Sequence, residues 1–240
     1  MKKLVLMACV LVGIGFGADI KTLTQQCEAK DHWACVDLLL EYGKAKNYSK
    51  FFELAQKACD LNNARVCRNL GQFYHFGFGV EKDFFKAAEY YQQACDMKEA
   101  AGCFNLGVLY LNGQGVEKNF VKAREYFQQA CDLENGDGCY ALGVLYEEGE
   151  GVRLDFAKAV SYYKMACNFN SSYGCDNLGM CYKNGQGVTK DINKAKELFK
   201  KACDLDLQDG CDNYKNEIMR ERNCSCSKSS LWLMSVVLAK

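Results

Sequence analysis

The chain of 240 residues contains no proline. Average usage would give about twelve prolines in a chain of this length. Because proline interrupts helices, its absence favours an interior of successive helices, punctuated by the 21 glycines. Net charge is absent as well, since Lys+Arg and Asp+Glu both number 30. A neutral chain lacks the electrostatic footprint of proteins that bind nucleic acid or acidic membranes, so we predict neither as a partner.

Histidine is scarce, and the sequence lacks the short cysteine spacings of zinc sites. His32 and His75 stand alone, and no C-x₂-C pair occurs. A zinc site would need one of these ligand patterns, so we expect no metal, and we expect no cofactor. The 16 cysteines are therefore interpreted as a disulfide framework.

The sequence also lacks an apolar run long enough to span a membrane comfortably. At the N-terminus, two lysines precede an apolar run over residues 4–16, and small residues follow it. This pattern is typical of a secretory signal peptide, which we assign to residues 1–18 with cleavage after Gly17 or Ala18. An exported chain reaches an oxidising compartment, where disulfides persist. We therefore expect a secreted or periplasmic protein without a membrane span.

Twelve of the cysteines form six pairs with the spacing C-x₇-C, and from Cys59 onward the pairs recur every 36 residues. A fixed period in this range is typical of a solenoid of repeats. The first cysteine of a pair ends one predicted helix and the second begins the next. The short connector and the small residues beside the cysteines allow the close Cα approach that a disulfide needs. The predicted bridges join Cys27 to Cys35, Cys59 to Cys67, Cys95 to Cys103, Cys131 to Cys139, Cys167 to Cys175 and Cys203 to Cys211.

Three further cysteines of the mature chain, Cys181, Cys224 and Cys226, have no partner in this scheme. Their odd number means that at least one is free or paired with another molecule. Cys181 falls among core-facing helical positions, so we expect it to be a buried thiol.

Each period carries the same pattern of core, turn and cap residues. A leucine-glycine pair and a tyrosine one turn later share one face of a first helix. Two glycines end that helix, because glycine adopts positive φ without steric cost. An Asp or Asn then caps a second helix, which carries an alanine and an aromatic residue. In one unit these residues are Leu106, Gly107, Tyr110, Gly113, Gly115, Asn119, Ala123 and Phe127. We expect the small residues to allow close helix packing and the aromatic stripe to form core rather than a cofactor site.

The pattern predicts an all-α fold, an α/α solenoid with a right-handed superhelix, built from helix-turn-helix repeats with one disulfide per hairpin. The repeat domain is predicted over residues 19–222 and a tail over residues 223–240. The first unit has a shortened turn, with Asn47 as its cap. The predicted units are 32–58, 64–94, 100–130, 136–166 and 172–202, followed by a polar capping helix over 208–222.

The combined motifs L-G-x-x-Y, G-x-G-V, an Asp or Asn cap, K-A, and an aromatic before A-C resemble the Sel-1-like class of tetratricopeptide-related repeats. G-x-G-V recurs at residues 77–80, 113–116, 149–152 and 185–188. With C-x₇-C at every hairpin, residues 20–220 resemble the Helicobacter cysteine-rich protein family of secreted repeat proteins. Proteins of that family are commonly described as penicillin-binding proteins or weak β-lactamases, and sometimes as factors acting on host cells. The resemblance therefore implies both a scaffold and an activity.

A recurring asparagine marks a candidate ligand site. Asn69, Asn105, Asn177 and Asn213 precede a core position in successive units, and Ala141 breaks the series. In tetratricopeptide-like superhelices the first helices line a concave groove suited to peptides. The asparagine amides would there bind a peptide, a protein (including a host protein) or a peptidoglycan fragment. Alternatively, each asparagine bonds neighbouring backbone and stabilises stacking. Both interpretations stay open, and we expect a monomer.

The enzyme alternative lacks a recognisable catalytic set. A serine β-lactamase needs S-x-x-K together with S-D-N and K-T-G elements. The chain has S-x-x-K at Ser161–Lys164 and again at Ser225–Lys228, without the other elements, and H-x-H-x-D is absent. No catalytic residue is predicted, so a β-lactamase rests on the family resemblance alone.

Overall fold

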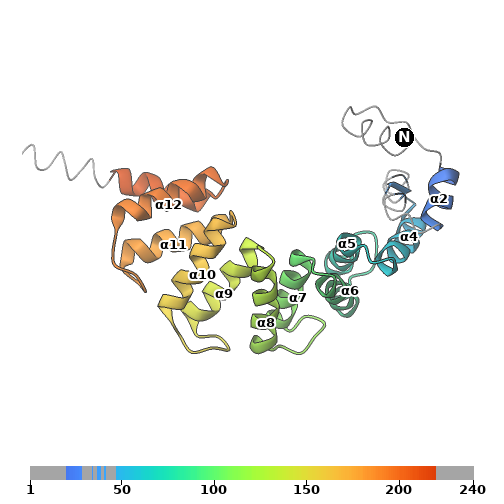
Figure 1. Ribbon diagram of the computed structural model, residues 1–240, viewed down its shortest axis with the longest axis horizontal. Helices are drawn as coiled ribbons and strands as arrows, with labels where there is room; N and C mark the ends of the chain where they lie inside the picture. The colour runs from blue at the N-terminus through green and yellow to red at the C-terminus, as the bar shows by residue number, and fades with distance from the viewer. Residues whose placement is uncertain (1–19, 29–33, 35–36, 39–40, 42–46, 220–240) are drawn as a thin grey trace, which may run out of the picture. The chain divides into compact units, whose positions relative to one another are not determined.

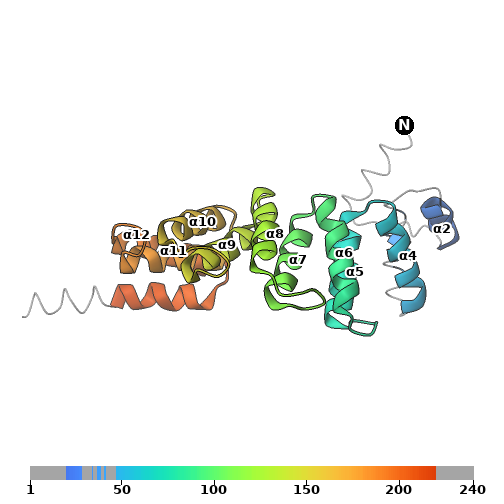
Figure 2. The same ribbon diagram turned by 90° about the horizontal axis from the view of Figure 1, so that it is seen from below.

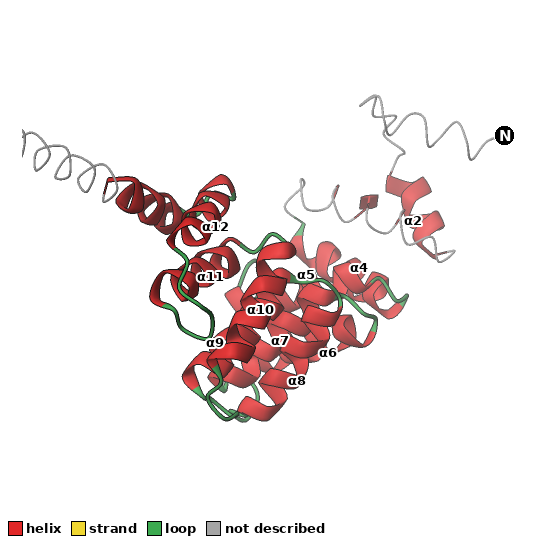
Figure 3. Ribbon diagram, turned by 60° about the vertical axis from the view of Figure 1, so that its left-hand side comes forward, coloured by secondary structure: helices red, strands yellow, loops and turns green. Residues whose placement is uncertain are grey.

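The computed structural model describes residues 20–28, 34, 37–38, 41 and 47–219. The predicted signal peptide at 1–18 and tail at 223–240 lie outside these residues, and the predicted domain boundaries stay predictions. The described part of the chain consists of helices joined by turns and contains no strand (Figure 3). None of its helices is both long and apolar enough to cross a bilayer. The predicted all-α class is confirmed.

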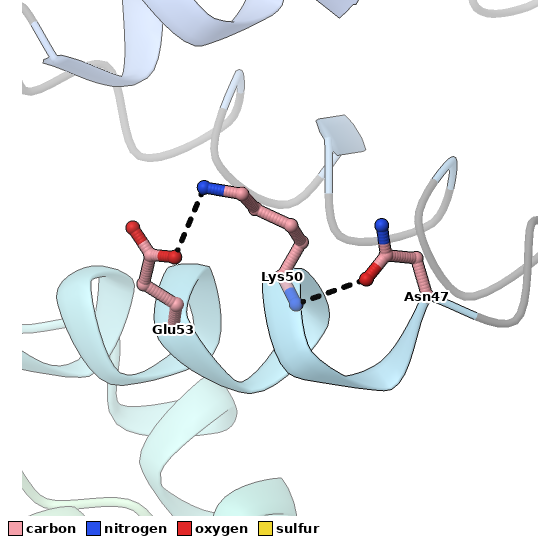
Figure 4. Close-up of polar contacts among 3 residues, drawn as sticks. All are labelled: Asn47, Lys50 and Glu53. Atoms are coloured by element: carbon pink, nitrogen blue, oxygen red, sulfur yellow. Dashed lines mark hydrogen bonds and ion pairs between the residues drawn. The ribbon is translucent and has the colours of Figure 1, made fainter.

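The first of two compact units ends at Asp83. Its described helices are α2 (Ile20–Glu28), α4 (Tyr48–Asp60) and α5 (Ala64–Phe76). Asn47 caps α4 as predicted, because its Oδ1 accepts a hydrogen bond from the Lys50 backbone N–H at 3.3 Å (Figure 4). The Lys50 ammonium lies 3.2 Å from the Glu53 carboxylate one turn later. The start of this helix therefore follows from its own local sequence.

The second unit begins at Phe84. Its helices are α6 (Phe84–Asp96), α7 (Ala100–Asn112), α8 (Phe120–Asp132), α9 (Gly136–Glu148), α10 (Phe156–Asn168), α11 (Ser172–Asn184) and α12 (Ile192–Asp204), followed by helical residues 208–219. Each helix packs against the next along the chain, and the two first helices α9 and α11 also touch each other (Figures 1 and 2). This nearest-neighbour packing is that of the predicted solenoid of helix-turn-helix repeats.

Helix ends lie where the repeated motifs predict them. Gly113 ends α7 with φ +69°, and its N–H bonds the Leu109 carbonyl; the equivalent glycines end α5, α9 and α11 in the same way. The predicted caps of the second helices accept a backbone N–H three residues later at 2.9–3.0 Å. These caps are Asn119, Asp155 and Asp191.

Five of the six predicted disulfides lie within the described residues and are present. Their Cα atoms are 4.5–4.9 Å apart, and they join Cys59 to Cys67, Cys95 to Cys103, Cys131 to Cys139, Cys167 to Cys175 and Cys203 to Cys211. Cys27 is also disulfide-bonded, while its predicted partner Cys35 lies outside the described residues. Small residues permit this approach: a Cβ built on Gly138 would stand 2.7 Å from the Cβ of Ala130.

In three hairpins of the second unit, an aromatic ring of the second helix packs against a glycine of the first helix. Phe127 is completely buried, and a Cβ on Gly107 would stand only 2.6 Å from its ring. The same arrangement joins Gly179 to Phe199, also at 2.6 Å. The aromatic stripe is therefore core, as predicted, and its burial fixes how closely the paired helices approach.

Candidate interaction surface

An aromatic pair lies where α9 and α11 meet. The Tyr140 ring on α9 is 5.7 Å from the Tyr173 ring on α11 and 5.9 Å from the buried Tyr163 ring on α10. Tyr173 is 53% exposed. Burial raises the pKa of the Tyr140 hydroxyl, so this group stays protonated and keeps a proton to donate. Tyrosines that combine ring area with a polar tip are common where proteins bind partners.

Asn177 on α11 contacts Tyr140 of this aromatic pair and the buried Tyr163. Its side chain hydrogen-bonds the hydroxyls of both Tyr140 and Tyr163. The Tyr163 hydroxyl in turn donates to the carboxylate of Glu147 on α9. Burial first, and then this carboxylate, raise the pKa of Tyr163. A neutral phenol between an amide and a carboxylate thus ties three successive helices together.

A second polar link joins α11 to the helical residues 208–219. The Asn213 side-chain amide donates to the Asp176 carboxylate at 2.9 Å. Burial raises the pKa of Asp176, and the hydrogen bond from Asn213 opposes that shift. Beside it, the Lys183 ammonium lies 2.8 Å from the carboxylate of Glu217, which is almost fully buried. The terminal helix is therefore docked through polar contacts with the preceding first helix.

We define the first-helix surface as Tyr140, Tyr173, Asp176, Asn177 and Asn213. Two of the predicted asparagines, Asn177 and Asn213, lie in it on adjacent first helices. Each bonds a side chain of the preceding first helix, which differs from the backbone bonding considered above. Both asparagines thus help to hold the stack, and their role in ligand binding stays a prediction.

The other two predicted asparagines lie elsewhere. Asn69 is on α5 in the first unit, where it lines a cleft of about 390 Å³ together with Gln72, Phe73, Phe76 and Phe78. Asn105 lies half-buried on α7 in the second unit. The structure therefore brings together only Asn177 and Asn213 of the predicted column.

Cys181 on α11 is a free thiol and is only 3% exposed, as predicted. Burial, followed by the Glu147 carboxylate, raises its pKa to about 11.

We expect Cys181 in the folded, oxidised chain to resist alkylation at pH 8, because only the thiolate is nucleophilic. The folded state favours the protonated thiol of Cys181. The contribution of this raised pKa to the stability of the fold is therefore complete below the usual thiol pKa of 9.0, and it is lost as the pH rises towards 11. Mass mapping of the alkylated Cys181 peptide, with and without denaturant, measures this protection. If Cys181 in the folded chain were alkylated as fast as in the denatured chain, the predicted protection would be contradicted.

The S-x-x-K residues of α10 do not form a recognisable nucleophilic site. The Ser161 hydroxyl donates to the Ala157 carbonyl at 3.0 Å on the exposed side of the helix. The second S-x-x-K, at Ser225–Lys228, lies outside the described residues. Within the described residues, no contact therefore supports a serine β-lactamase.

The repeats match a known family model, described as the Sel1 repeat, over residues 33–63, 64–98, 100–135, 136–168 and 172–207. The chain belongs to the Sel1 repeat family. Helicobacter pylori cysteine rich protein B is 40% identical over 57% of this chain and 98% of its own, with a TM-score of 0.46. That identity over nearly its whole length confirms the predicted resemblance to the Helicobacter cysteine-rich proteins.

Two further solved structures share the Sel1 architecture. A protective antigen of uropathogenic Escherichia coli is 24% identical over 81% of this chain with a TM-score of 0.74, and this chain spans 42% of its length. A Sel1 repeat protein from Oxalobacter formigenes is 28% identical over 69% of this chain and 68% of its own, with a TM-score of 0.62. A search of curated proteins found no match. The chain is thus a Sel1 repeat scaffold, an architecture suited to protein–protein interaction.

The repeats, aligned in register, contain a sequence signal for the aromatic pair that lies outside the repeated motifs. Tyr173 stands two residues before the second cysteine of its hairpin, where the other repeats of the second unit carry Ala101, Asp137 and Asp209. A single exposed aromatic at a position that is otherwise small or acidic is not required by the repeat, and therefore marks this hairpin as special.

Proposed function

We propose that this chain is an exported Sel1 repeat scaffold whose first-helix surface binds a peptide or protein segment, cell-wall peptides included. The observation that carries the proposal is the Tyr140–Tyr173 pair, in which Tyr173 is exposed and Tyr140 is hydrogen-bonded to Asn177. Side chains that are fixed before binding lose little conformational entropy when a ligand arrives. The surface is therefore preorganised for recognition.

The disulfides support the compartment in this proposal. Five bridges within the described residues indicate an oxidising environment, outside the cell or in the periplasm. In such a compartment the chain would meet peptidoglycan fragments and surface-exposed or host proteins. Export itself rests on the pattern of residues 1–18.

The chemistry of the surface favours a peptide main chain with an apolar side chain. The rings of Tyr140 and Tyr173 supply apolar area, and the Tyr140 hydroxyl, which the raised pKa keeps protonated, supplies a hydrogen-bonding group. The Asp176 carboxylate accepts hydrogen bonds, and one of its bonds already comes from Asn213. Peptide N–H and C=O groups match these donors and acceptors.

We expect Tyr173→Ala to weaken partner binding about tenfold, since exposed tyrosines are common hot spots, with the melting temperature nearly unchanged. Another repeat already has Ala101 at this position, so the variant should fold. Partners are captured from cell-envelope extract and host-cell lysate with the oxidised chain, and affinities for the captured partner are then measured by calorimetry.

Val121→Ala is the matched control, because Val121 is 48% exposed on α8 and the equivalent residue of the next repeat is Ala157. This control is expected to bind like the unmodified chain. Equal affinity of Tyr173→Ala and Val121→Ala for the captured partner would refute the first-helix surface as the binding site.

The alternative function, a penicillin-binding protein or weak β-lactamase, has the family resemblance as its support. The two functions are separable with a chromogenic cephalosporin and highly purified protein. Turnover that a point change in the first-helix surface abolishes would establish the enzyme. Stoichiometric binding without turnover would instead make β-lactam recognition a side effect of binding cell-wall peptides.

A further inference from the structure

A cleft of about 670 Å³ lies on the second unit and shares no lining residue with the first-helix surface. It is lined by Arg124 of α8, Tyr146 of α9, residues 152–155 of the turn between α9 and α10, and Phe156 and Lys158 of α10. This volume lies within the range of clefts that hold small molecules or peptide side chains. The cleft is therefore large enough for an organic ligand.

The charge of this cleft is positive and uncompensated. Arg124, Arg153 and Lys158 line it, with Asp155 as the carboxylate. Asp155 is already engaged, because its Oδ1 accepts the backbone N–H of Lys158 at 3.0 Å as the cap of α10. Among the ion pairs of the described residues, none includes any of the three cations. Three cations and one capping carboxylate leave two positive charges facing a common space.

The basic cleft belongs to one repeat and is not a requirement of the fold. Residues 153 and 154 are Arg and Leu, whereas the equivalent pairs are Glu81-Lys82, Glu117-Lys118 and Thr189-Lys190. Arg124 likewise stands where the repeats on either side carry Ala88 and Val160. At residue 153 an arginine thus stands in place of a glutamate in two repeats and of a threonine in a third, and at residue 154 a leucine stands in place of a lysine.

Apolar surface lies next to these charges. Leu154 is 50% exposed. The Tyr146 ring stacks on Tyr162 at 5.5 Å, and the Lys158 ammonium lies 5.2 Å from its centroid. The cleft therefore offers a fixed aromatic wall and a leucine beside its cations, which suits a ligand that carries both negative charge and an apolar group.

We propose that this cleft binds an acidic peptide segment of a partner protein, with carboxylates placed on either side of an apolar side chain. Arg124, Arg153 and Lys158 pair with the carboxylates. Leu154 and Tyr146 contact the apolar side chain. This second site goes beyond the function proposed above, because it uses other residues and another ligand chemistry.

The test uses the full oxidised chain and a fluorescein-labelled peptide of alternating Glu and Leu, followed by fluorescence anisotropy. Lys158→Ala and Lys122→Ala form a matched pair, because Lys122 sits over Tyr110 at 5.0 Å as Lys158 sits over Tyr146, but outside the cleft. We expect Lys158→Ala to weaken binding about fivefold and Lys122→Ala less than twofold, since distant exposed charges are screened.

Arg153→Glu reverses the charge of the cleft wall and should weaken binding tenfold or more, about 1.4 kcal/mol or above. Its fold is expected to persist, because Glu81 and Glu117 occupy the equivalent position in other repeats. If circular dichroism showed that it misfolds, the Lys158 and Lys122 pair would still decide the question.

Three results would overturn the proposal. The first is equal binding by the Lys158→Ala and Lys122→Ala variants. The second is equal affinity for a peptide of alternating Lys and Leu. The third is unselective anion binding, seen as equal affinity for an oligonucleotide of the same charge or as competition by inorganic phosphate at the peptide's own affinity. Because Tyr173→Ala should leave this binding intact, the failure of one proposed site is distinguishable from the failure of the other.

Discussion

Replacing Cys131 and Cys139 together by alanine is expected to lower the free energy of unfolding by about 2.5 kcal/mol. The bridge closes a short loop between α8 and α9, with its Cα atoms 4.6 Å apart. Without the bridge, the unfolded chain has more conformational entropy, and this favours unfolding. Urea denaturation at equilibrium, followed by circular dichroism, measures the change in the unfolding midpoint.

The native packing around this bridge adds to the effect. Cys131 and Cys139 are both fully buried, and Gly138 lets the two helices approach so closely that a Cβ there would stand 2.7 Å from the Cβ of Ala130. Truncating both sulfurs removes the link that holds this approach. The control is the same double variant in reductant, where it and the unmodified chain should converge, since both then lack the bridge. An unchanged urea midpoint under oxidising conditions would show that the bridge does not stabilise the fold.

Gly107→Ala is expected to destabilise the chain by about 2 kcal/mol, within the usual range for overpacking a core. The new Cβ would stand 2.6 Å from the Phe127 ring and 3.3 Å from the Ala123 carbonyl oxygen. Because Phe127 is completely buried, neither the ring nor the backbone has free space to move into. Helix propensity acts in the opposite direction, since alanine favours a helix over glycine by about 1 kcal/mol. Thermal and urea unfolding of the single variant give the net value.

A double-mutant cycle separates these two effects. Phe127→Leu shortens the side chain that the new methyl group would meet, so Gly107→Ala should cost less in the Phe127→Leu background than alone. A coupling energy of about 1 kcal/mol or more is expected for groups in direct contact. Stabilisation by Gly107→Ala alone would mean that helix propensity dominates and that the close approach of the helices is not needed.

Local features of this protein were predictable because their partners are close in sequence. Each disulfide joins residues eight apart, and each cap bonds an N–H three residues later. Residues this near each other meet whenever the intervening helix or turn forms, whatever the rest of the chain does. Because the same hairpin recurs at a fixed period, the stacking of hairpins into a solenoid could also be predicted from the spacing of the motifs.

The candidate sites depended on contacts between repeats, which the motifs do not encode. Asn177 was predicted as a site residue, but its bonds to Tyr140 and Tyr163 were not. Asn213 and Asp176 are 37 residues apart in the chain. Which side chains of two successive hairpins touch depends on the small rotation between them, and that rotation is a property of packed helix faces.

Helix boundaries, capping, the turn glycines and the pairing of cysteines were thus readable from residues alone, because each is decided by geometry within a turn or a short connector. The Tyr140–Tyr173 pair and the cleft around Arg153 emerged only when the hairpins were stacked. Stacking brings together side chains from different repeats, and the free energy that selects this arrangement comes from burying rings such as Phe127 and Tyr163 rather than from any local preference.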